Sequence, residues 1–228
     1  MSITRRFWVT GASQGLGLAL VEQLLEQGHR VAASAMDSQE LDALAQRHGN
    51  HLLRVPGQIQ DRAQAEAASQ QLQRQWGALD GLIVNAGVCD YLADDTPDTE
   101  LFERLVSSNL RATEHALAGA RPLLAKGDKP QVMAILSRYS AQQLFDPRQP
   151  AAGHNSLPQW LREQREPLKA QGIDLTVVAP QSAPLAQVAP EEWTAQTAAL
   201  ELVARLDQRL PELVLEAMYL SNLWPLPR

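Results

Sequence analysis

The chain has 228 residues, of which 45% are hydrophobic and 20% charged, a composition typical of one soluble globular domain with its own core. The formal net charge of -6, with basic residues scattered along the chain, argues against a nucleic-acid partner. Cys89 is the only cysteine, so no disulfide forms within the chain, as expected in a reducing compartment. No stretch reaches the ~20 apolar residues that cross a bilayer, and "MSITRRFWVTGA" does not resemble a signal peptide, so a cytoplasmic location is expected.

Short apolar runs recur along the chain and are predicted to be strands. The runs are "RRFWVT" (5–10), "RVAASA" (30–35), "HLLRVP" (51–56), "LDGLIV" (79–84), "QVMAIL" (131–136), "IDLTVV" (173–178) and "ELVLEA" (212–217). Most are separated by segments with helical periodicity. Strands that alternate with helices form parallel units, so the prediction is an α/β fold: a doubly wound parallel sheet of about seven strands with helices on both faces, in a single domain over 1–228.

Helix boundaries are marked by capping residues and glycines. Leu16, Leu20 and Leu24 recur at helical spacing before Gly28, where a helix is expected to end. Asp37 and Glu40 form a capping box ahead of "LDALAQRH", which Gly49 ends. The third predicted helix covers 60–76 and stops at Gly77. Thr96 and Pro97 are expected to begin a long fourth helix that runs to position 124.

A glycine-rich turn, "TGASQGLG" (10–17), follows the first predicted strand and opens the first helix. Gly11 permits a tight turn, Gly15 lets the backbone approach a pyrophosphate, and Gly17 allows the helix to pack closely on the sheet. The phosphates would then lie at a helix N-terminus, where free N–H groups favour an anion. The turn predicts a dinucleotide site, against the simpler alternative of a turn shaped only for packing.

Its spacing, G-x-x-x-G-x-G, together with "VNAG" after the fourth strand, resembles the short-chain dehydrogenase/reductase family over most of the chain. "SSNLRAT" puts Asn109 at the family's structural and proton-relay asparagine, and Ser137 is at its substrate-orienting serine. "GIDLTVVAPQ" resembles the sixth strand, with Pro180 retained and Gln181 in place of a glycine. The resemblance implies a Rossmann-like fold, oxidoreductase activity and NAD or NADP as cofactor. It places the cofactor contacts at Gly11, Ser13, Gln14, Gly15, Leu16, Gly17, Met36, Gln58, Asn85, Ala86, Gly87 and Pro180.

The catalytic pattern departs from that of the family, in which a tyrosine transfers the substrate proton and a lysine four residues later lowers the pKa of the tyrosine. Counting forward from Ser137 and backward from Gly172 gives the same register, with Pro150 at the tyrosine position and His154 at the lysine position. Ser156 is expected to cap the helix, with Pro158 in its first turn. Residues 147–155 are then a loop, and Pro167 is expected to interrupt the helix again.

The residues expected around the adenosine are also unusual. The family's charge selector after the second strand falls on Ala35 and Met36, and Gln58 replaces an adenine-contacting aspartate. Gln14 is at a loop position that is often basic in NADP enzymes. With neither an acid for a free ribose nor an arginine for a 2′-phosphate, the sequence does not choose between NAD and NADP.

Three hypotheses follow for the function. The first is an oxidoreductase with rebuilt acid–base groups, in which Ser137, Tyr139 or His154 assists the proton transfer; the alternatives are a pocket-lining Tyr139 and a solvated His154. The second is a non-catalytic protein that binds a nucleotide, metabolite or partner. The third is a non-redox enzyme, such as an isomerase or cyclase. We expect a small-molecule ligand and no metal; homo-oligomer formation stays open, and the family's helix-pairing dimer is in doubt.

Overall fold

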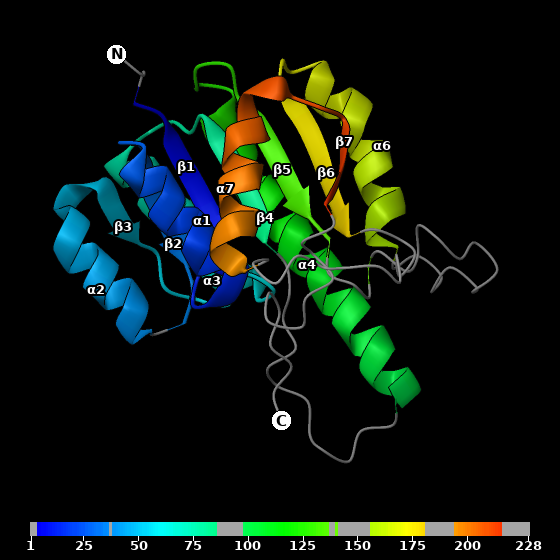
Figure 1. Cartoon of the computed structure of the whole chain (residues 1–228). Helices are drawn as coiled ribbons and strands as arrows, with labels where there is room; N and C mark the ends of the chain where they lie inside the picture. The colour runs from blue at the N-terminus through cyan, green and yellow to red at the C-terminus, as the bar shows by residue number, and fades with distance from the viewer. Residues whose placement is uncertain are drawn as a thin grey trace.

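The computed structural model describes residues 4–36, 38–85, 98–136, 140, 156–180 and 194–215. Within these ranges seven strands form one sheet in the order β3-β2-β1-β4-β5-β6-β7, and all neighbouring strands are parallel (Figure 1). The strands are β1 (Arg6–Thr10), β2 (Arg30–Ser34), β3 (Leu52–Arg54), β4 (Gly81–Asn85), β5 (Gln131–Ile135), β6 (Asp174–Pro180) and β7 (Glu212–Leu215). Each predicted strand is confirmed. The strand order reverses between β1 and β4, which creates a switch point at the carboxyl edge of the sheet.

Helices cover both faces of the sheet, as the sequence predicts. They are α1 (Gly15–Glu26), α2 (Gln39–His48), α3 (Arg62–Gln75), α4 (Asp98–Leu124), α6 (Leu157–Lys169) and α7 (Ala195–Arg205), with short 3-10 turns η1 (Gly49–His51) and η2 (Leu206–Gln208). One apolar core unites α1, α2 and α7 with one face, and a second unites α3, α4 and α6 with the other (Figure 1). Among the helices that the structure describes, none combines the length and apolar character needed to cross a membrane.

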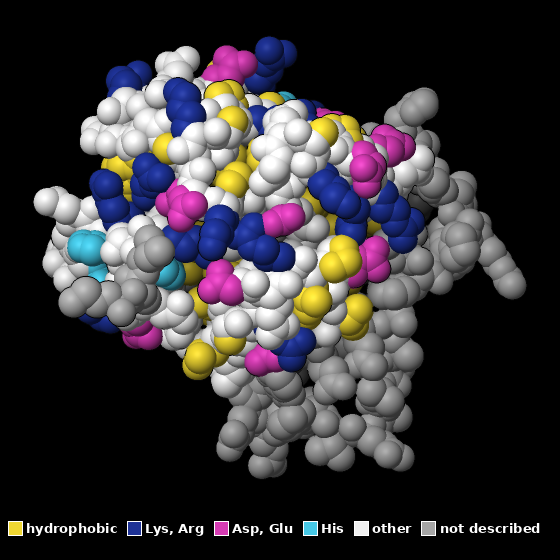
Figure 2. Space-filling view, turned by 90° about the horizontal axis from the view of Figure 1, so that it is seen from above, with side chains coloured by type: hydrophobic (Ala, Val, Ile, Leu, Met, Phe, Trp, Pro, Cys, Tyr) yellow, Lys and Arg dark blue, Asp and Glu magenta, His cyan; other side chains and the backbone are white. Residues whose placement is uncertain are grey.

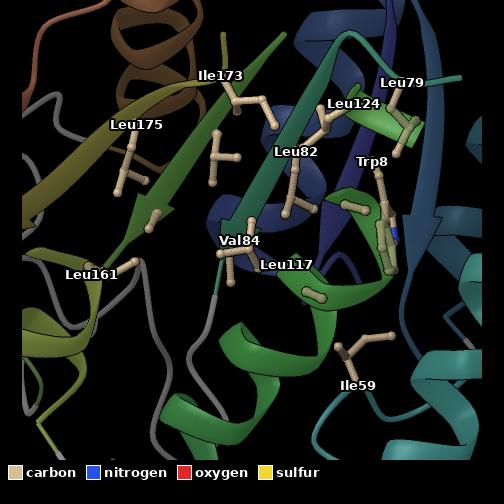
Figure 3. Close-up of a cluster of buried hydrophobic side chains, with 14 of the residues drawn as sticks. Trp8, Ile59, Leu79, Leu82, Val84, Leu117, Leu124, Leu161, Ile173 and Leu175 are labelled. Atoms are coloured by element: carbon tan, nitrogen blue, oxygen red, sulfur yellow. The ribbon is translucent and has the colours of Figure 1, made fainter. Parts of the chain in front are cut away.

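The central strands are buried on both sides, as is usual in parallel sheets. In β1, Phe7 and Val9 belong to the core under α1, and Trp8 belongs to the opposite core. Figure 3 shows the second core, which includes Trp8, Leu82 and Leu117; Trp8 and Leu82 are paired across β1 and β4. The indole Nε1 of Trp8 donates to Ser34 Oγ at 2.8 Å, so this polar atom is satisfied in the interior.

Helix caps agree with the sequence prediction except at α2. Ser38, rather than Asp37, is the N-cap of α2, and its Oγ accepts from Leu41 N at 3.3 Å. Ser156 caps α6 as predicted, accepting from Gln159 N at 3.4 Å. The predictions for Thr96, Pro97 and residues 147–155 fall outside the described residues.

The predicted interruption at Pro167 is wrong, because α6 runs unbroken through this residue. A proline removes one main-chain hydrogen bond from a helix. In α6 the flanking residues Leu161 and Leu168 are both fully buried in the second core, and this burial holds the helix together across the proline.

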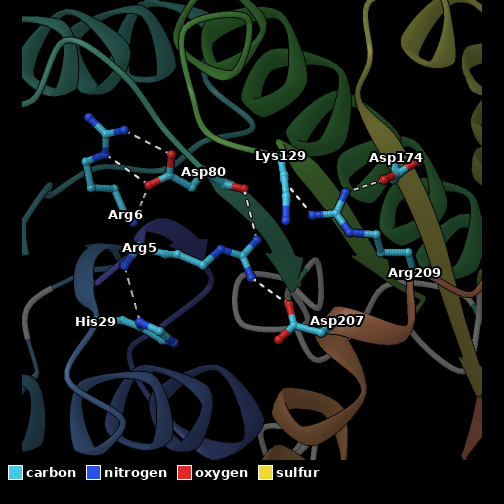
Figure 4. Close-up of polar contacts among 8 residues, drawn as sticks. All are labelled: Arg5, Arg6, His29, Asp80, Lys129, Asp174, Asp207 and Arg209. Carbon is cyan, nitrogen blue, oxygen red and sulfur yellow. Dashed lines mark hydrogen bonds and ion pairs between the residues drawn. The ribbon is translucent and has the colours of Figure 1, made fainter. Parts of the chain in front are cut away.

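The amino edge of the sheet is closed by a polar network around Asp80 (Figure 4). The Asp80 carboxylate accepts from Arg6 N, Nε and Nη2 at 2.8, 3.0 and 2.9 Å, and from Asp128 N at 2.8 Å. Burial raises the pKa of Asp80, but the hydrogen bonds from Arg6 and from Asp128 N outweigh it and lower the pKa overall. Figure 2 looks down on this end of the molecule, where basic and acidic side chains are interspersed. The predicted cofactor site lies at the opposite, carboxyl edge of the sheet.

Candidate functional site

The predicted glycine turn lies at the switch point, between the end of β1 and the start of α1, with Gly11 and Gly15 at φ angles of 64° and 55°. A Cβ on Gly11 would lie 2.3 Å from the carbonyl oxygen of Asn85, at the end of β4. A Cβ on Gly17 would lie only 2.0 Å from the carbonyl oxygen of Gly11. The packing at Gly11 and at Gly17 therefore leaves no room for a side chain at either position.

Asn85, the last residue of the neighbouring strand β4, is hydrogen-bonded to the turn. Its Nδ2 donates to the carbonyl oxygen of Gly11 at 3.0 Å, and the residue is only 6% exposed. Its Oδ1 is buried and has no hydrogen-bond partner among the described residues. Because a buried amide oxygen usually has a partner, this atom is an acceptor that a ligand or water would satisfy.

The first turn of α1 is suited to bind an anion. Gln14 is its N-cap in an extended conformation, no side chain caps the helix, and its first turn contains no acidic residue. The N–H groups at a helix N-terminus carry a partial positive charge and stay available when no side chain accepts from them. A pyrophosphate fits these donors. Leu16 is 1% exposed and packs in the core under α1, so only its backbone can contribute to such a site.

The residues after β2 form a second part of the site. Met36 is 43% exposed, and its Sδ lies 3.4 Å from Gln58 Nε2, so these two predicted contacts are brought together. Ser38 Oγ lies 2.9 Å from the carbonyl oxygen of Ser13 in the glycine turn. It also lies 2.8 Å from Glu40 Oε2.

Ser38 and Glu40 are not among the residues predicted for the site. Hydrogen bonds from its own backbone N–H and from Ser38 lower the pKa of Glu40, which favours the carboxylate. The predicted capping box includes Glu40 but not Ser38, and it does not indicate a contact with the glycine turn.

Of the predicted catalytic residues, the structure describes only Asn109. It lies in α4 and is 1% exposed, and its carbonyl oxygen accepts from Thr113 Oγ1 at 2.8 Å. Ser137, Tyr139 and His154 lie outside the described residues, as do Ala86 and Gly87. Leu136, which precedes Ser137, is fully buried immediately after β5, and Pro180 is the last residue of β6. Helix α6 begins at Leu157, beyond the positions of Pro150 and His154.

A groove of about 490 Å³ lies between α3 and α4, lined by Arg62, Ala65, Glu66, Ser69, Glu114, His115, Ala118, Gly119 and Pro122. None of these residues belongs to the glycine turn or to the predicted cofactor contacts. In the part of the chain that the structure describes, no cluster of three or more His, Cys, Asp or Glu side chains is arranged to hold a metal ion.

A family model described as short chain dehydrogenase matches residues 6–193. Among curated proteins, the 3-phenylpropionate-dihydrodiol/cinnamic acid-dihydrodiol dehydrogenase of Escherichia coli O157:H7 is 32% identical over 133 residues, which are 56% of this chain and 49% of that protein. The protein of the same description from E. coli strain K12 / DH10B is 37% identical over 108 residues, 45% of this chain and 40% of that protein. The matched part of the chain spans about half the length of these curated relatives.

Solved structures share the fold. A short-chain dehydrogenase from Streptomyces avermitilis superposes with a TM-score of 0.75 at 19% identity, covering 97% of this chain and 92% of that one. The L-sorbose reductase from Gluconobacter frateurii, solved with NADPH and L-sorbose, gives a TM-score of 0.71 at 16% identity, covering 94% and 95%. At these identities the likeness establishes the architecture alone.

Proposed function

This chain belongs to the short-chain dehydrogenase family, and from that membership we propose that it is a nicotinamide dinucleotide-binding oxidoreductase with an altered proton-transfer site. One observation carries the proposal: the uncapped N-terminus of α1 is held at the switch point by the contact of Asn85 with Gly11. In doubly wound sheets ligands bind in the crevice at the carboxyl ends of the strands on either side of such a point. Gly15, Gly17 and the first amides of α1 would hold the pyrophosphate, and a bound nicotinamide supplies or accepts hydride.

The proton-transfer groups are proposed from the sequence register. Pro150 and His154 occupy the positions of the family's tyrosine and lysine, so Ser137, Tyr139 and His154 are the candidate donors and acceptors. A positioned general acid increases the rate of such a reaction by a factor of about 10²–10⁴. Orientation of the reactants contributes several kcal/mol independently. We therefore expect weak redox activity that depends on one or more of these three side chains.

The names of the relatives indicate which substrates to test first. One relative is named as a dehydrogenase of dihydrodiols, and a structural neighbour is a reductase that was solved with L-sorbose. Vicinal diols and hydroxyketones are therefore the first substrates to test, with a small hydroxylated molecule as the proposed ligand of this chain.

The non-catalytic alternative is supported by one observation at the proton-transfer side. Helix α6 begins only after the positions of Pro150 and His154. A protein that binds a dinucleotide or metabolite without turning it over would have this combination of a kept glycine turn and a changed catalytic helix. A non-redox enzyme that reuses the cleft has no separate support among the described residues.

Calorimetric titration of the full chain with NAD, NADH, NADP and NADPH tests the proposal. Binding of at least one is expected, and the absence of binding to all four would overturn it. With the bound cofactor, turnover of diols and hydroxyketones is then compared in wild type, Ser137→Ala, Tyr139→Phe and His154→Ala, with the exposed His51→Ala as a control. Turnover unchanged in all three site variants would contradict the proton path, and binding without any turnover would favour the non-catalytic alternative.

A further inference from the structure

We propose that the dinucleotide site selects NAD(H) over NADP(H) through Glu40, whose carboxylate Ser38 holds beside the glycine turn. This inference rests on the proposed function and names the cofactor class of that same site. In folds of this type the adenosine ribose lies close to the end of the second strand, where an acid favours a free 2′-hydroxyl and an arginine accepts a 2′-phosphate. Here β2 ends at Ser34, and neither Ala35 nor Met36 carries a charge.

The geometry brings a carboxylate to this position from the next helix. Ser38 Oγ lies 2.9 Å from the carbonyl oxygen of Ser13 and 2.8 Å from Glu40 Oε2. The hydroxyl group of Ser38 thus bridges the glycine turn and the carboxylate, with one proton to donate to either oxygen at a time. The Glu40 carboxylate is separated from the glycine turn by a single hydroxyl group.

The N-terminus of α2 is already occupied by groups of this chain. Leu41 N donates to Ser38 Oγ at 3.3 Å, and the Glu40 carboxylate accepts from its own backbone N–H. Asp42 lies in the same first turn, but Arg54 pairs with it, so among the described residues Glu40 is the acid that stays unpaired by an arginine there. A 2′-phosphate would meet repulsion from the Glu40 carboxylate instead of free donors.

The two arginines that flank the loop after β3 are paired with acids. Arg54 pairs with Asp42, and Arg62 Nε lies 2.8 Å from Glu66 Oε1. The contact between Met36 and Gln58 brings only uncharged groups, a thioether and an amide, to this corner of the site. Among the described residues of this corner, the charges favour a neutral ribose hydroxyl over a phosphate.

The test is calorimetric titration of the full chain with NADH and with NADPH at low ionic strength, in wild type and in Glu40→Gln. Glutamine keeps an oxygen that can accept from Ser38 and removes the charge. We expect wild type to bind NADH more tightly by about tenfold or more, as like charges near a protein surface predict. Glu40→Gln should raise the NADPH affinity by about three- to tenfold and change the NADH affinity by less than about twofold. Glu26→Gln, at the far end of α1, is the matched control and should change neither.

The outcomes separate this inference from the proposed function. Failure of both nucleotides to bind overturns the proposed function, and the inference with it. Equal affinities, or tighter binding of NADPH, overturn the inference alone. A preference for NADH that Glu40→Gln leaves intact overturns the role of Glu40. A preference for NADH over NADPH that decreases as the salt concentration is raised supports the electrostatic cause, because exposed charges are screened by ions.

Discussion

Asn85 Nδ2 lies 3.0 Å from the carbonyl oxygen of Gly11, and this hydrogen bond joins the end of β4 to the turn after β1. The same carbonyl oxygen faces Gly17, where an added Cβ would lie 2.0 Å away and also 2.7 Å from Asn85 Nδ2. The end of β4, the turn after β1 and the first turn of α1 therefore meet at one oxygen atom. The position of the first turn of α1 depends on this contact.

Gly17→Ala should displace that turn. The added methyl group has no space, so we expect a loss of about 1–3 kcal/mol in the free energy of unfolding, as for other overpacked sites. NADH affinity should fall at the same time, because the amides of α1 move. Urea unfolding and calorimetry measure the two effects.

Gly28→Ala is the matched control for this change. Gly28 has a φ of 81° and open space around its Cβ position, at the opposite end of α1. A left-handed alanine costs about 1–2 kcal/mol, so this variant should lose stability and keep its NADH affinity. Wild-type NADH binding by Gly17→Ala would show that the close contact does not position the site.

The seven strands could be predicted from the sequence because strands buried on both faces read as continuous apolar runs. The glycine turn could be predicted for a related reason: a tight turn between a strand and a helix requires Gly11 and Gly15 at positive φ. Both signals are local, because each depends on residues that are close together in the sequence.

The missed features depend on tertiary contacts. Asp37 and Ser38 are both good capping residues, and the contact of Ser38 with Ser13 involves a residue 25 positions away. The role proposed for Glu40 depends on the same contact between Ser38 and Ser13, which no local pattern reveals. The continuity of α6 through Pro167 likewise depends on burial of its apolar face against the sheet.

Asp80→Asn should destabilise the fold strongly. The carboxylate is 2% exposed and accepts from three nitrogen atoms of Arg6 and from Asp128 N. An asparagine would turn an amide donor toward these donors and leave the Arg6 charge without its partner. We expect a loss of about 2–4 kcal/mol in the free energy of unfolding, measured in urea.

Asp207→Asn tests whether this effect needs burial. Asp207 also pairs with an arginine, Arg5, at 3.0 Å, but its side chain is 87% exposed. Exposed pairs contribute about 0–1 kcal/mol, so this variant should differ little from wild type. Equal losses in the free energy of unfolding in Asp80→Asn and Asp207→Asn would refute the assignment of Asp80 as the centre of the network.

Stability should fall as the pH drops below about 6.5, the usual pKa of histidine, because of His29. Its Nδ1 lies 3.3 Å from Arg5 N, which donates to it, so the imidazole is neutral in the fold. Burial and the nearby Arg5 guanidinium lower the pKa of His29. The unfolded chain then binds a proton at a higher pH than the folded chain, and the free energy of unfolding decreases from about pH 6.5 downward until the folded pKa is passed.

His29→Gln keeps an acceptor for Arg5 N and removes the titration. The free energy of unfolding, measured in urea, should differ less between pH 7.5 and pH 5 in this variant than in wild type. A pH dependence that His29→Gln leaves unchanged would assign the effect to other groups.

Met36→Arg should create a site for a 2′-phosphate beside the end of β2. Met36 is 43% exposed and lies against Gln58, so a longer charged side chain can be accommodated at the surface. A hydrogen bond to a charged group contributes about 1.5–3 kcal/mol, which corresponds to about a 10- to 100-fold gain in NADPH affinity. NADH affinity should change little, because its ribose carries no phosphate. Met36→Leu is the control for the lost thioether, and a gain in NADPH affinity in Met36→Leu as large as in Met36→Arg would contradict the electrostatic explanation.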